Sequence, residues 1–264
     1  MINLSKEISI VTSFNKRVYE SDYQILVDSM RETHPEIDFY MYHENSWERK
    51  HHNTEIEFKN LWDNAHTYDL FKENEWVEDF LNTSPFKDVH KLGPKNAKSA
   101  NDFPNSNDYW NRSSIYWFRK LPSLYHCASI CKTPLMIWVD CDVKFTKPLD
   151  ETFLNYVKGY DVSSMLRPTM WTETGFVVYN LKKNGAHFLD EYINYYTSLQ
   201  AFTESRYDDC TIFDCTWKKL KDEVSVGGLT PDQGAPWPPG GRGFNYIWHY
   251  KEPLVEVRFD KDGN

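Results

Sequence analysis

Two aspartates, Asp140 and Asp142, directly follow the apolar run Leu135–Val139. The run is short, begins after Pro134 and is rich in strand-forming residues, which predicts a buried central strand. Carboxylates two residues apart on a strand point to the same side, and they repel unless a cation lies between them. The pair therefore predicts a divalent metal site where the strand ends, the edge at which α/β sheets bind ligands. Two aspartates that merely cap a turn are the alternative.

His249 is the candidate for a third metal ligand. It follows the Gly- and Pro-rich segment 227–243, which is predicted to be a turn-rich loop. An imidazole nitrogen beside carboxylate oxygens suits Mn²⁺ better than Mg²⁺, so we expect Mn²⁺ at Asp140, Asp142 and His249, with Mg²⁺ as the alternative. Lys251 follows closely, where its charge could offset that of a phosphate. The alternative is a structural histidine, since the chain has nine.

Two further sets of residues could contact a nucleotide. Arg119 and Lys120 lie on a predicted helix before the acidic strand, where they could neutralise phosphate oxygens. The first predicted strand ends with residues that could hold a base or a ribose, namely Thr12, Ser13, Phe14 and Asn15. The ordinary alternatives are a solvated helix face for the first set and a simple turn for the second.

Glu173 and Asp209 are the candidate catalytic residues. The acidic pair lies mid-chain, after a predicted β-α-β unit and a helix with two basic residues, and that layout suits transfer of a sugar from a nucleotide. Such transfer with inversion needs a carboxylate general base beside the acceptor hydroxyl. Transfer with retention needs a nucleophile or a stabilising dipole on the opposite face of the anomeric carbon. Glu173 enters a predicted strand after the acidic pair, and Asp209 begins a predicted helix. The alternative for Asp209 is a cap of that helix.

The elements expected around these residues describe a parallel α/β sheet. A strand at 8–13, a helix at 23–30 and a strand at 37–42 give a β-α-β order, which implies a right-handed crossover. Further strands are expected at 160–165 and 175–180, and further helices at 186–199 and 209–220.

The segment 47–111 interrupts this pattern. Apolar spacing predicts two short amphipathic helices, at 58–65 and 76–81, and the polar residues 93–111 are predicted to form a long loop. A helix is expected at 114–128, interrupted at Pro122. We interpret 47–111 as a helical and loop insertion in a single domain of residues 1–264, placed to shape an acceptor site.

Composition narrows the partners. The chain has 264 residues and a net charge of -9, which disfavours nucleic acid and anionic membranes as partners. No apolar run approaches the roughly 20 residues of a membrane-spanning helix, and the first ten residues do not form a signal peptide. The five cysteines lack the C-x-x-C spacing of a zinc site. We expect them to be reduced, which favours a cytoplasmic location.

The high aromatic content of 16% fits a packed core or rings that stack on sugars or bases.

Five segments carry a resemblance to a known family. Residues 118–120 match its Phe-x-Lys pattern, 137–142 its Ile-Trp-Leu-Asp-x-Asp strand, and 173–176 its Glu-Cys-Gly-Phe strand. Residues 206–210 match Trp-His-Asp-Ser weakly, and 248–252 match Asp-His-x-Lys-Gly. Together they resemble metal-dependent glycosyltransferases of the GT-A fold. The likeness is closest to a bacterial and phage group loosely related to the lipopolysaccharide galactosyltransferases and glycogenin.

This resemblance implies a Rossmann-like α/β fold with a mixed, mostly parallel sheet between helices. It also implies a nucleotide-sugar donor, UDP-linked, a glycan or other hydroxyl-bearing acceptor, and a divalent metal at Asp140, Asp142 and His249. Glu252 stands where the family has glycine, and Tyr207 and Asp208 replace its Trp-His. The Asn/Asp-x-Gly of the retaining relatives is absent at Glu173, so the stereochemistry stays open.

Three other classes remain as alternatives. A phosphohydrolase of the haloacid dehalogenase class would use Asp140 as nucleophile, but it places its Asp-x-Asp near the start of the domain and follows it with small residues, whereas Val143 and Lys144 follow here. A nucleotidyltransferase would need a Gly-rich basic loop after the first strand, which residues 12–15 do not provide. A glycan- or nucleotide-binding protein with an inactive transferase fold would not need the acidic pair and His249.

Overall fold

The computed structural model describes residues 3–21, 23–59, 61–93, 100–167 and 171–229, and the backbone of two short strands at 242–244 and 247–249. The main sheet contains β1 (Ile8–Phe14), β2 (Asp38–His43), β3 (Ala65–Asp69), β4 (Leu135–Val139), β6 (Val162–Met165), β7 (Glu173–Asn180) and β8 (Val226–Gly228). A second sheet contains β5 (Val143–Phe145), β9 (Arg242–Phe244) and β10 (Ile247–His249).

The helices lie mostly between successive strands. They are α1 (Lys16–Ser21), α2 (Tyr23–Thr33), α3 (Asn45–His52), α4 (Leu70–Glu73), α5 (Trp76–Thr83), α6 (Ser106–Phe118), α7 (Lys120–Ile130), α8 (Glu151–Val157), α9 (Gly185–Thr197) and α10 (Asp209–Lys219). The strands and helices expected outside 47–111 are therefore found with small shifts of their ends. The expected loop 227–243 differs at both ends, because its first two residues belong to β8 and its last two to β9. Residues 230–241 lie outside the described residues.

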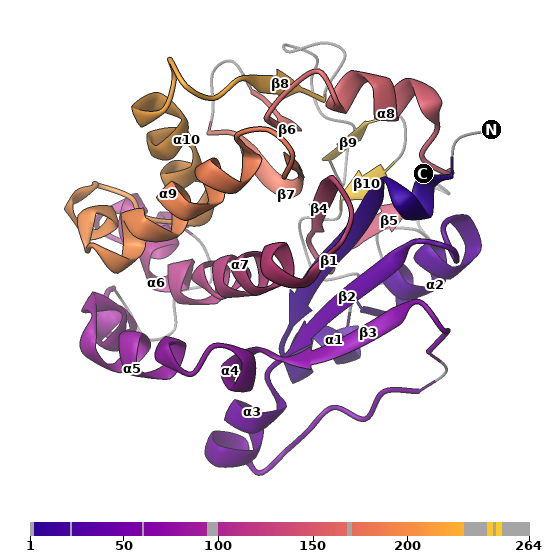
Figure 1. Cartoon of the computed structure of the whole chain (residues 1–264). Coiled ribbons are helices and arrows are strands. Elements are labelled where there is room, and N and C mark those ends of the chain that lie inside the picture. Colours follow the sequence, from indigo (N-terminus) through magenta and orange to yellow (C-terminus); the bar gives the residue numbers. More distant parts are fainter. Residues whose placement is uncertain are drawn as a thin grey trace.

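The main sheet is mixed and mostly parallel, which confirms the predicted fold class. Its strand order is β3-β2-β1-β4-β7-β6-β8 (Figure 1). β1 runs parallel to both β2 and β4, whereas β7 runs antiparallel to its neighbours β4 and β6. Successive strands progress outward from β1 to β3, and the chain then returns to the other side of β1 as β4. The strand order thus reverses between β1 and β4, the position where open α/β sheets bind ligands.

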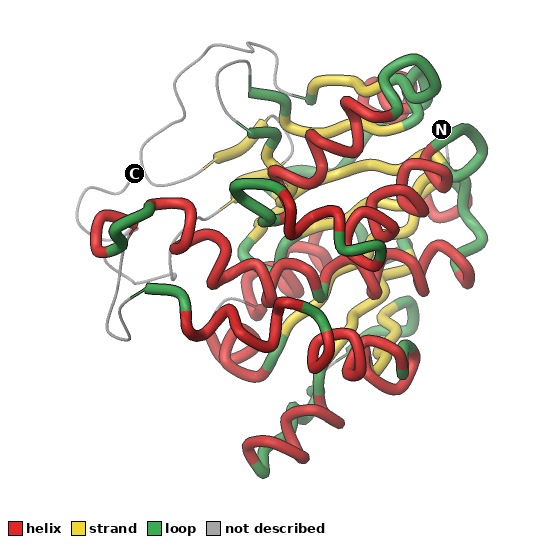
Figure 2. Tube along the Cα trace, turned by 90° about the vertical axis from the view of Figure 1, so that its left-hand side faces the viewer, coloured by secondary structure: helices red, strands yellow, loops and turns green. Residues whose placement is uncertain are grey.

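Helices cover both faces of the sheet, so its central strands are apolar throughout. On β4, Met136 and Trp138 pack on one face with α7, α9 and α10, while Leu135, Ile137 and Val139 pack on the other face with α2 and α8. Figure 2 shows the strands as a layer behind the helices that face the viewer. Both faces of β4 being buried explains why its five residues lack a polar alternation.

The segment 47–111 differs from its prediction in two places. No helix forms at 58–65; residues 54–59 and 61–62 are extended or irregular, and Ala65–Asp69 is β3, paired in parallel with β2. The helical spacing is misleading because Trp62 stacks flat on Phe39 of β2 (5.8 Å between ring centroids), which an extended chain also allows. The second predicted helix is confirmed as α5.

The predicted loop 93–111 is also shorter than expected. α6 begins at Ser106, where the Asn105 side chain accepts a hydrogen bond from the backbone of Asn107 (3.1 Å) and caps the helix. The interruption expected at Pro122 lies at Arg119, between α6 and α7. Proline is tolerated in the first turn of α7, because the N–H groups there have no partner within the helix.

Helix α2 fixes the short strand β5, which directly follows the acidic pair. The Phe145 N–H donates to Ser29 Oγ (3.1 Å), and the Leu149 N–H donates to His34 Nε2 (2.8 Å). The Thr33 hydroxyl donates to Ser29 O and therefore accepts from His34 Nδ1 (2.6 Å). His34 is thus a neutral, fully buried acceptor that holds the segment after the acidic turn.

We expect acid to weaken this attachment. Burial lowers the pKa of His34 to about 4, whereas an unfolded histidine titrates near pH 6.5. The unfolded state therefore binds the extra proton first, so stability is full above about pH 6.5 and falls as the pH drops towards 4. Urea unfolding at pH 7 and pH 5 should show a loss of about 2 kcal/mol that His34→Gln does not share. Equal losses in both proteins would contradict this prediction.

Candidate functional site

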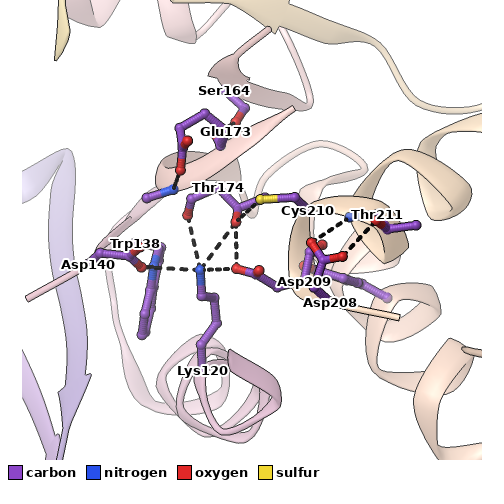
Figure 3. Close-up of polar contacts among 12 residues, drawn as sticks. Lys120, Trp138, Asp140, Ser164, Glu173, Thr174, Asp208, Asp209, Cys210 and Thr211 are labelled. Carbon is purple, nitrogen blue, oxygen red and sulfur yellow. Dashed lines mark hydrogen bonds and ion pairs between the residues drawn. The ribbon is translucent and has the colours of Figure 1, made fainter. Parts of the chain in front are cut away.

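The centre of the candidate site is the side chain of Lys120, the first residue of α7. Its ammonium forms ion pairs with Asp140 Oδ1 (3.1 Å) and with Asp209, and the Lys120 side chain is only 5% exposed. It also donates to the carbonyl and hydroxyl oxygens of Thr174 (both 3.3 Å). Figure 3 shows these groups converging on Lys120 from β7, from α10 and from the turn after β4. Residues predicted separately to bind phosphate, metal and sugar are therefore in direct contact.

The two carboxylates keep the Lys120 side chain charged. Burial alone would lower the pKa of Lys120, but Asp140 and Asp209 beside it raise that pKa above its ordinary value. The Asp209 carboxylate also accepts from the Thr174 hydroxyl (2.6 Å), and it lies at the N-terminus of α10, where the helix dipole favours a negative charge. The buried ammonium of Lys120 and the buried carboxylate of Asp209 thus form one hydrogen-bonded group with the half-buried carboxylate of Asp140.

A bulge in β7 directs Thr174 into this group. The pairing of β6 with β7 shifts register between Ser164, which lies opposite Val177, and Met165, which lies opposite Glu173. Bulges interrupt side-chain alternation and re-aim side chains. The result is that Thr174 points towards Lys120, whereas Glu173 lies on the other side of the strand near Ser164 (Figure 3).

Asp140 and Asp142 lie in a turn rather than on the strand. β4 ends at Val139, the Asp140 N–H donates to Gly175 O (2.8 Å), and the Val143 N–H donates back to Asp140 O (3.0 Å). The prediction that the two carboxylates share one strand face is therefore wrong, because the chain turns here from the main sheet into β5 of the second sheet. The indole N–H of Trp138 donates to Asp140 Oδ1 (2.6 Å) and orients that carboxylate.

The backbone brings His249 to this turn. β10 runs antiparallel to β5, and His249 lies opposite Val143, the residue after Asp142. β9 pairs with β10 on its other side, with Arg242 opposite His249. His249 on β10 and the acidic pair before β5 are therefore close enough in the backbone to be ligands of one metal, although they are far apart in sequence. Lys251 lies outside the described residues.

The four residues at the end of β1 are partly used by the fold. Thr12 and Phe14 are buried, and the Phe14 ring packs against Tyr23 (4.7 Å between centroids). Asn15 accepts a hydrogen bond from the Val18 N–H (3.0 Å) and so caps α1. Ser13 is half-buried. These residues adjoin β4, where the strand order reverses, but the buried ring of Phe14 belongs to the core.

Two predicted residues are not brought into the Lys120 group. Arg119 forms a buried ion pair with Glu44 and lies over the ring of Trp47 (5.3 Å). Burial raises the pKa of Glu44, although Arg119 acts in the opposite sense. Glu173 is 1% exposed and lies 3.7 Å from Arg167 Nη1. Both charged side chains therefore have partners of their own, away from Lys120.

Sequence reasoning missed Thr174, Trp138 and the role of Asp208. Trp138 lies two residues before Asp140, and Thr174 directly follows Glu173. Both lie in segments that carry the family resemblance, but neither was assigned a role. Asp208, Asp209 and Cys210 place potential metal ligand atoms within 4.8 Å of one another. However, Asp208 caps α10 through Thr211 and pairs with Arg206, and Asp209 pairs with Lys120. The carboxylates of Asp208 and Asp209 are thus each paired with a basic side chain of the protein.

No helix in the described part of the chain is long and apolar enough to cross a membrane. The chain matches no protein family and no curated protein. Among solved structures it is similar to the apo form of mouse xyloside xylosyltransferase 1, at 12% identity and a TM-score of 0.45, over 85% of each chain. It is also similar to the glycosyltransferase GlyE of Streptococcus pneumoniae TIGR4, at 12% identity and a TM-score of 0.45. That likeness covers 84% of this chain but 45% of GlyE, so this chain spans less than half of GlyE's length.

Proposed function

We propose that this chain is a metal-dependent glycosyltransferase, which moves a sugar from a UDP-linked donor to an acceptor hydroxyl. The observation that supports this most is the buried Lys120 ammonium, which joins Asp140 in the candidate metal turn to Asp209 at the start of α10. Asp140 follows β4, whose neighbour β1 marks the reversal of strand order where nucleotides bind in α/β sheets. In this proposal Asp140 binds the metal and Asp209 acts on the reacting sugar. Lys120 connects the two carboxylates.

The donor atoms at the β4–β5 turn suit a divalent metal. Asp140 and Asp142 supply carboxylate oxygens within one turn, and the backbone of His249 lies opposite the residue that follows them. Carboxylate oxygens with one imidazole nitrogen favour Mn²⁺, with Mg²⁺ as the alternative. A bound metal would offset the negative charge of a departing diphosphate and so make it a better leaving group.

The side chains of this chain supply the other roles. Trp138 and Lys120 both donate to Asp140 Oδ1 and fix its orientation, which is how contacts behind a metal ligand tune a site. Ser13 and Asn15, which are half-buried at the end of β1, hold the nucleoside, and Lys251 offsets phosphate charge. Asp209 stabilises the positive charge that develops at the anomeric carbon or takes the acceptor proton. Glu173 shapes the β7 bulge from its own side of the strand.

A thermal-shift series tests the function. The protein is heated with UDP, GDP, ADP and CDP, each with and without Mn²⁺, because a ligand that binds only the folded state raises Tm. We expect UDP to raise Tm in the presence of Mn²⁺ and EDTA to remove the shift. Hydrolysis of UDP-sugars then identifies the sugar. No shift with any nucleotide would overturn the proposal, and a phospho-aspartate trapped at Asp140 would favour a phosphohydrolase.

Asp142→Asn should separate metal binding from folding. The variant removes one proposed ligand charge but leaves the ion pairs of Lys120 intact. We expect the affinity for Mn²⁺ with UDP to fall at least about 10- to 100-fold, with unfolding in urea unchanged. Asp38→Asn, at the opposite end of β2 from the site, is the matched control and should bind like the wild type. Isothermal titration checks both variants, and wild-type affinity in Asp142→Asn would remove Asp142 from the ligand set.

A further inference from the structure

Helix α6 carries a pair of stacked indoles that the proposed mechanism does not use. Trp110 and Trp117 lie about two turns apart, hence on one side of the helix, with ring centroids 5.9 Å apart and ring planes inclined by 30°. Both are only half-buried, unlike Phe118, the residue after Trp117, which is fully buried in the core. Both indoles therefore reach the protein surface at the edge of the core.

An arginine is held against the ring of Trp110. The Arg206 guanidinium lies 4.3 Å from the centre of the Trp110 ring. It donates to both carboxylate oxygens of Asp208, with an Nη2 to Oδ1 distance of 3.1 Å. Arg206 is itself half-buried. Its planar group is thus held between an indole and a carboxylate, which limits the entropy lost when it donates to a ligand.

Two structural connections join these residues to Asp209, the candidate catalytic residue. Asp208 directly precedes Asp209. Buried Asn111 of α6 accepts from the Tyr207 N–H (2.9 Å) and donates to Ser205 O (3.2 Å), which ties α6 to the segment before α10. At the other end, α6 runs through Trp117 into Arg119 and then Lys120, the partner of Asp209. The indole pair is therefore connected to Lys120 through α6 and to Asp209 through the segment 205–208.

We infer that Trp110, Trp117 and Arg206 form the acceptor subsite and that the acceptor is a carbohydrate. This inference rests on the proposed glycosyl transfer. A pyranose ring has an apolar C–H face that packs on an indole, and edge hydroxyls that accept from a guanidinium. Since Trp110 already lies between Arg206 and Trp117, the indole assigned to the sugar is that of Trp117. The nucleoside is assigned elsewhere, to the end of β1. The net charge of -9 argues against a nucleic acid strand on these rings.

The test separates acceptor binding from donor chemistry. Trp117→Ala and Trp117→Phe are assayed for UDP-sugar hydrolysis without acceptor and for transfer to a panel of p-nitrophenyl glycosides. We expect Trp117→Ala to raise the KM for the glycoside about tenfold, with hydrolysis unchanged and with Trp117→Phe close to the wild type. Trp76→Ala, an exposed tryptophan on α5, is the matched control and should change neither activity.

Two outcomes would overturn the inference: an unchanged KM in Trp117→Ala, or an equal loss of hydrolysis and transfer. Saturation-transfer NMR with methyl glycosides and with UMP supplies a readout that needs no catalysis. If the protein binds glycosides through Trp117 but does not hydrolyse UDP-sugars, the proposed transferase function is wrong. The carbohydrate subsite would still be supported. Binding of UMP in place of glycosides would assign these rings to the nucleoside and end the inference.

Discussion

Asp209→Asn is expected to lower the rate of sugar transfer by about 100- to 10,000-fold, the range typical of a positioned acid or base. The amide keeps the size of the side chain and can still accept from Thr174, but it has no negative charge to offer the anomeric carbon or the acceptor proton. Binding of UDP with Mn²⁺ should survive, since the proposed metal ligands are untouched. Steady-state transfer assays should therefore show the loss in kcat rather than in donor affinity.

The matched control for this prediction is Asp190→Asn, an exposed aspartate on α9. It removes the same charge from the protein and should leave kcat within about twofold, as expected for a surface change far from the reacting groups. Transfer by Asp209→Asn at the rate of the control would show that another group does the chemistry. In that event Glu173 would be the next carboxylate to replace.

Lys120→Met is expected to destabilise the protein by about 3–5 kcal/mol, because removal of one partner leaves buried charges uncompensated. Asp140 and Asp209 would then lie close together with no cation between them. For a chain of this length the change corresponds to a fall in Tm of roughly 10 °C. Since the pKa of Lys120 is raised, its contribution is present below about pH 10 and is lost only as the pH rises through the folded-state value. Measurements at pH 7 to 9 should therefore give one constant difference.

Two further variants make this result specific. Lys219→Met breaks the exposed ion pair with Glu191 and should cost no more than about 1 kcal/mol. Adding Asp209→Asn to Lys120→Met removes one of the stranded charges and should recover part of the lost stability. A Lys120→Met protein as stable as the wild type would contradict a role for the ammonium as a buried counterion.

The parts of the fold that could be predicted are those with a strong local signal. β4 is five consecutive apolar residues, and its buried position on both faces of the sheet requires no more than that. α10 begins where the acidic residues Asp208 and Asp209 precede an apolar period, and Asp208 does cap it. The strand β3 was not predicted. It is an edge strand that carries His66 and Thr67, so it shows little apolar alternation, and the residues before it fit a helical spacing.

The candidate site was predictable residue by residue but not in its connections. Asp140, Asp209 and Lys120 each had a local motif, yet nothing in the sequence indicated that one ammonium would pair with both carboxylates. Arg119 and Lys120 are adjacent and were assigned one role, but the break between α6 and α7 sends Arg119 to Glu44 and Lys120 to Asp209. The bulge in β7 likewise depends on pairing with β6, which single-strand patterns do not reveal.

The pairing of β5 with β10 separates the proposed metal ligands between two sheets. The described strands of the main sheet all precede residue 242, whereas His249 lies on β10, which pairs with β5 in the second, smaller sheet. The proposed third ligand is therefore held by a different sheet from the one that carries Asp140. Local opening of the small sheet would then weaken metal binding while the main sheet stayed folded.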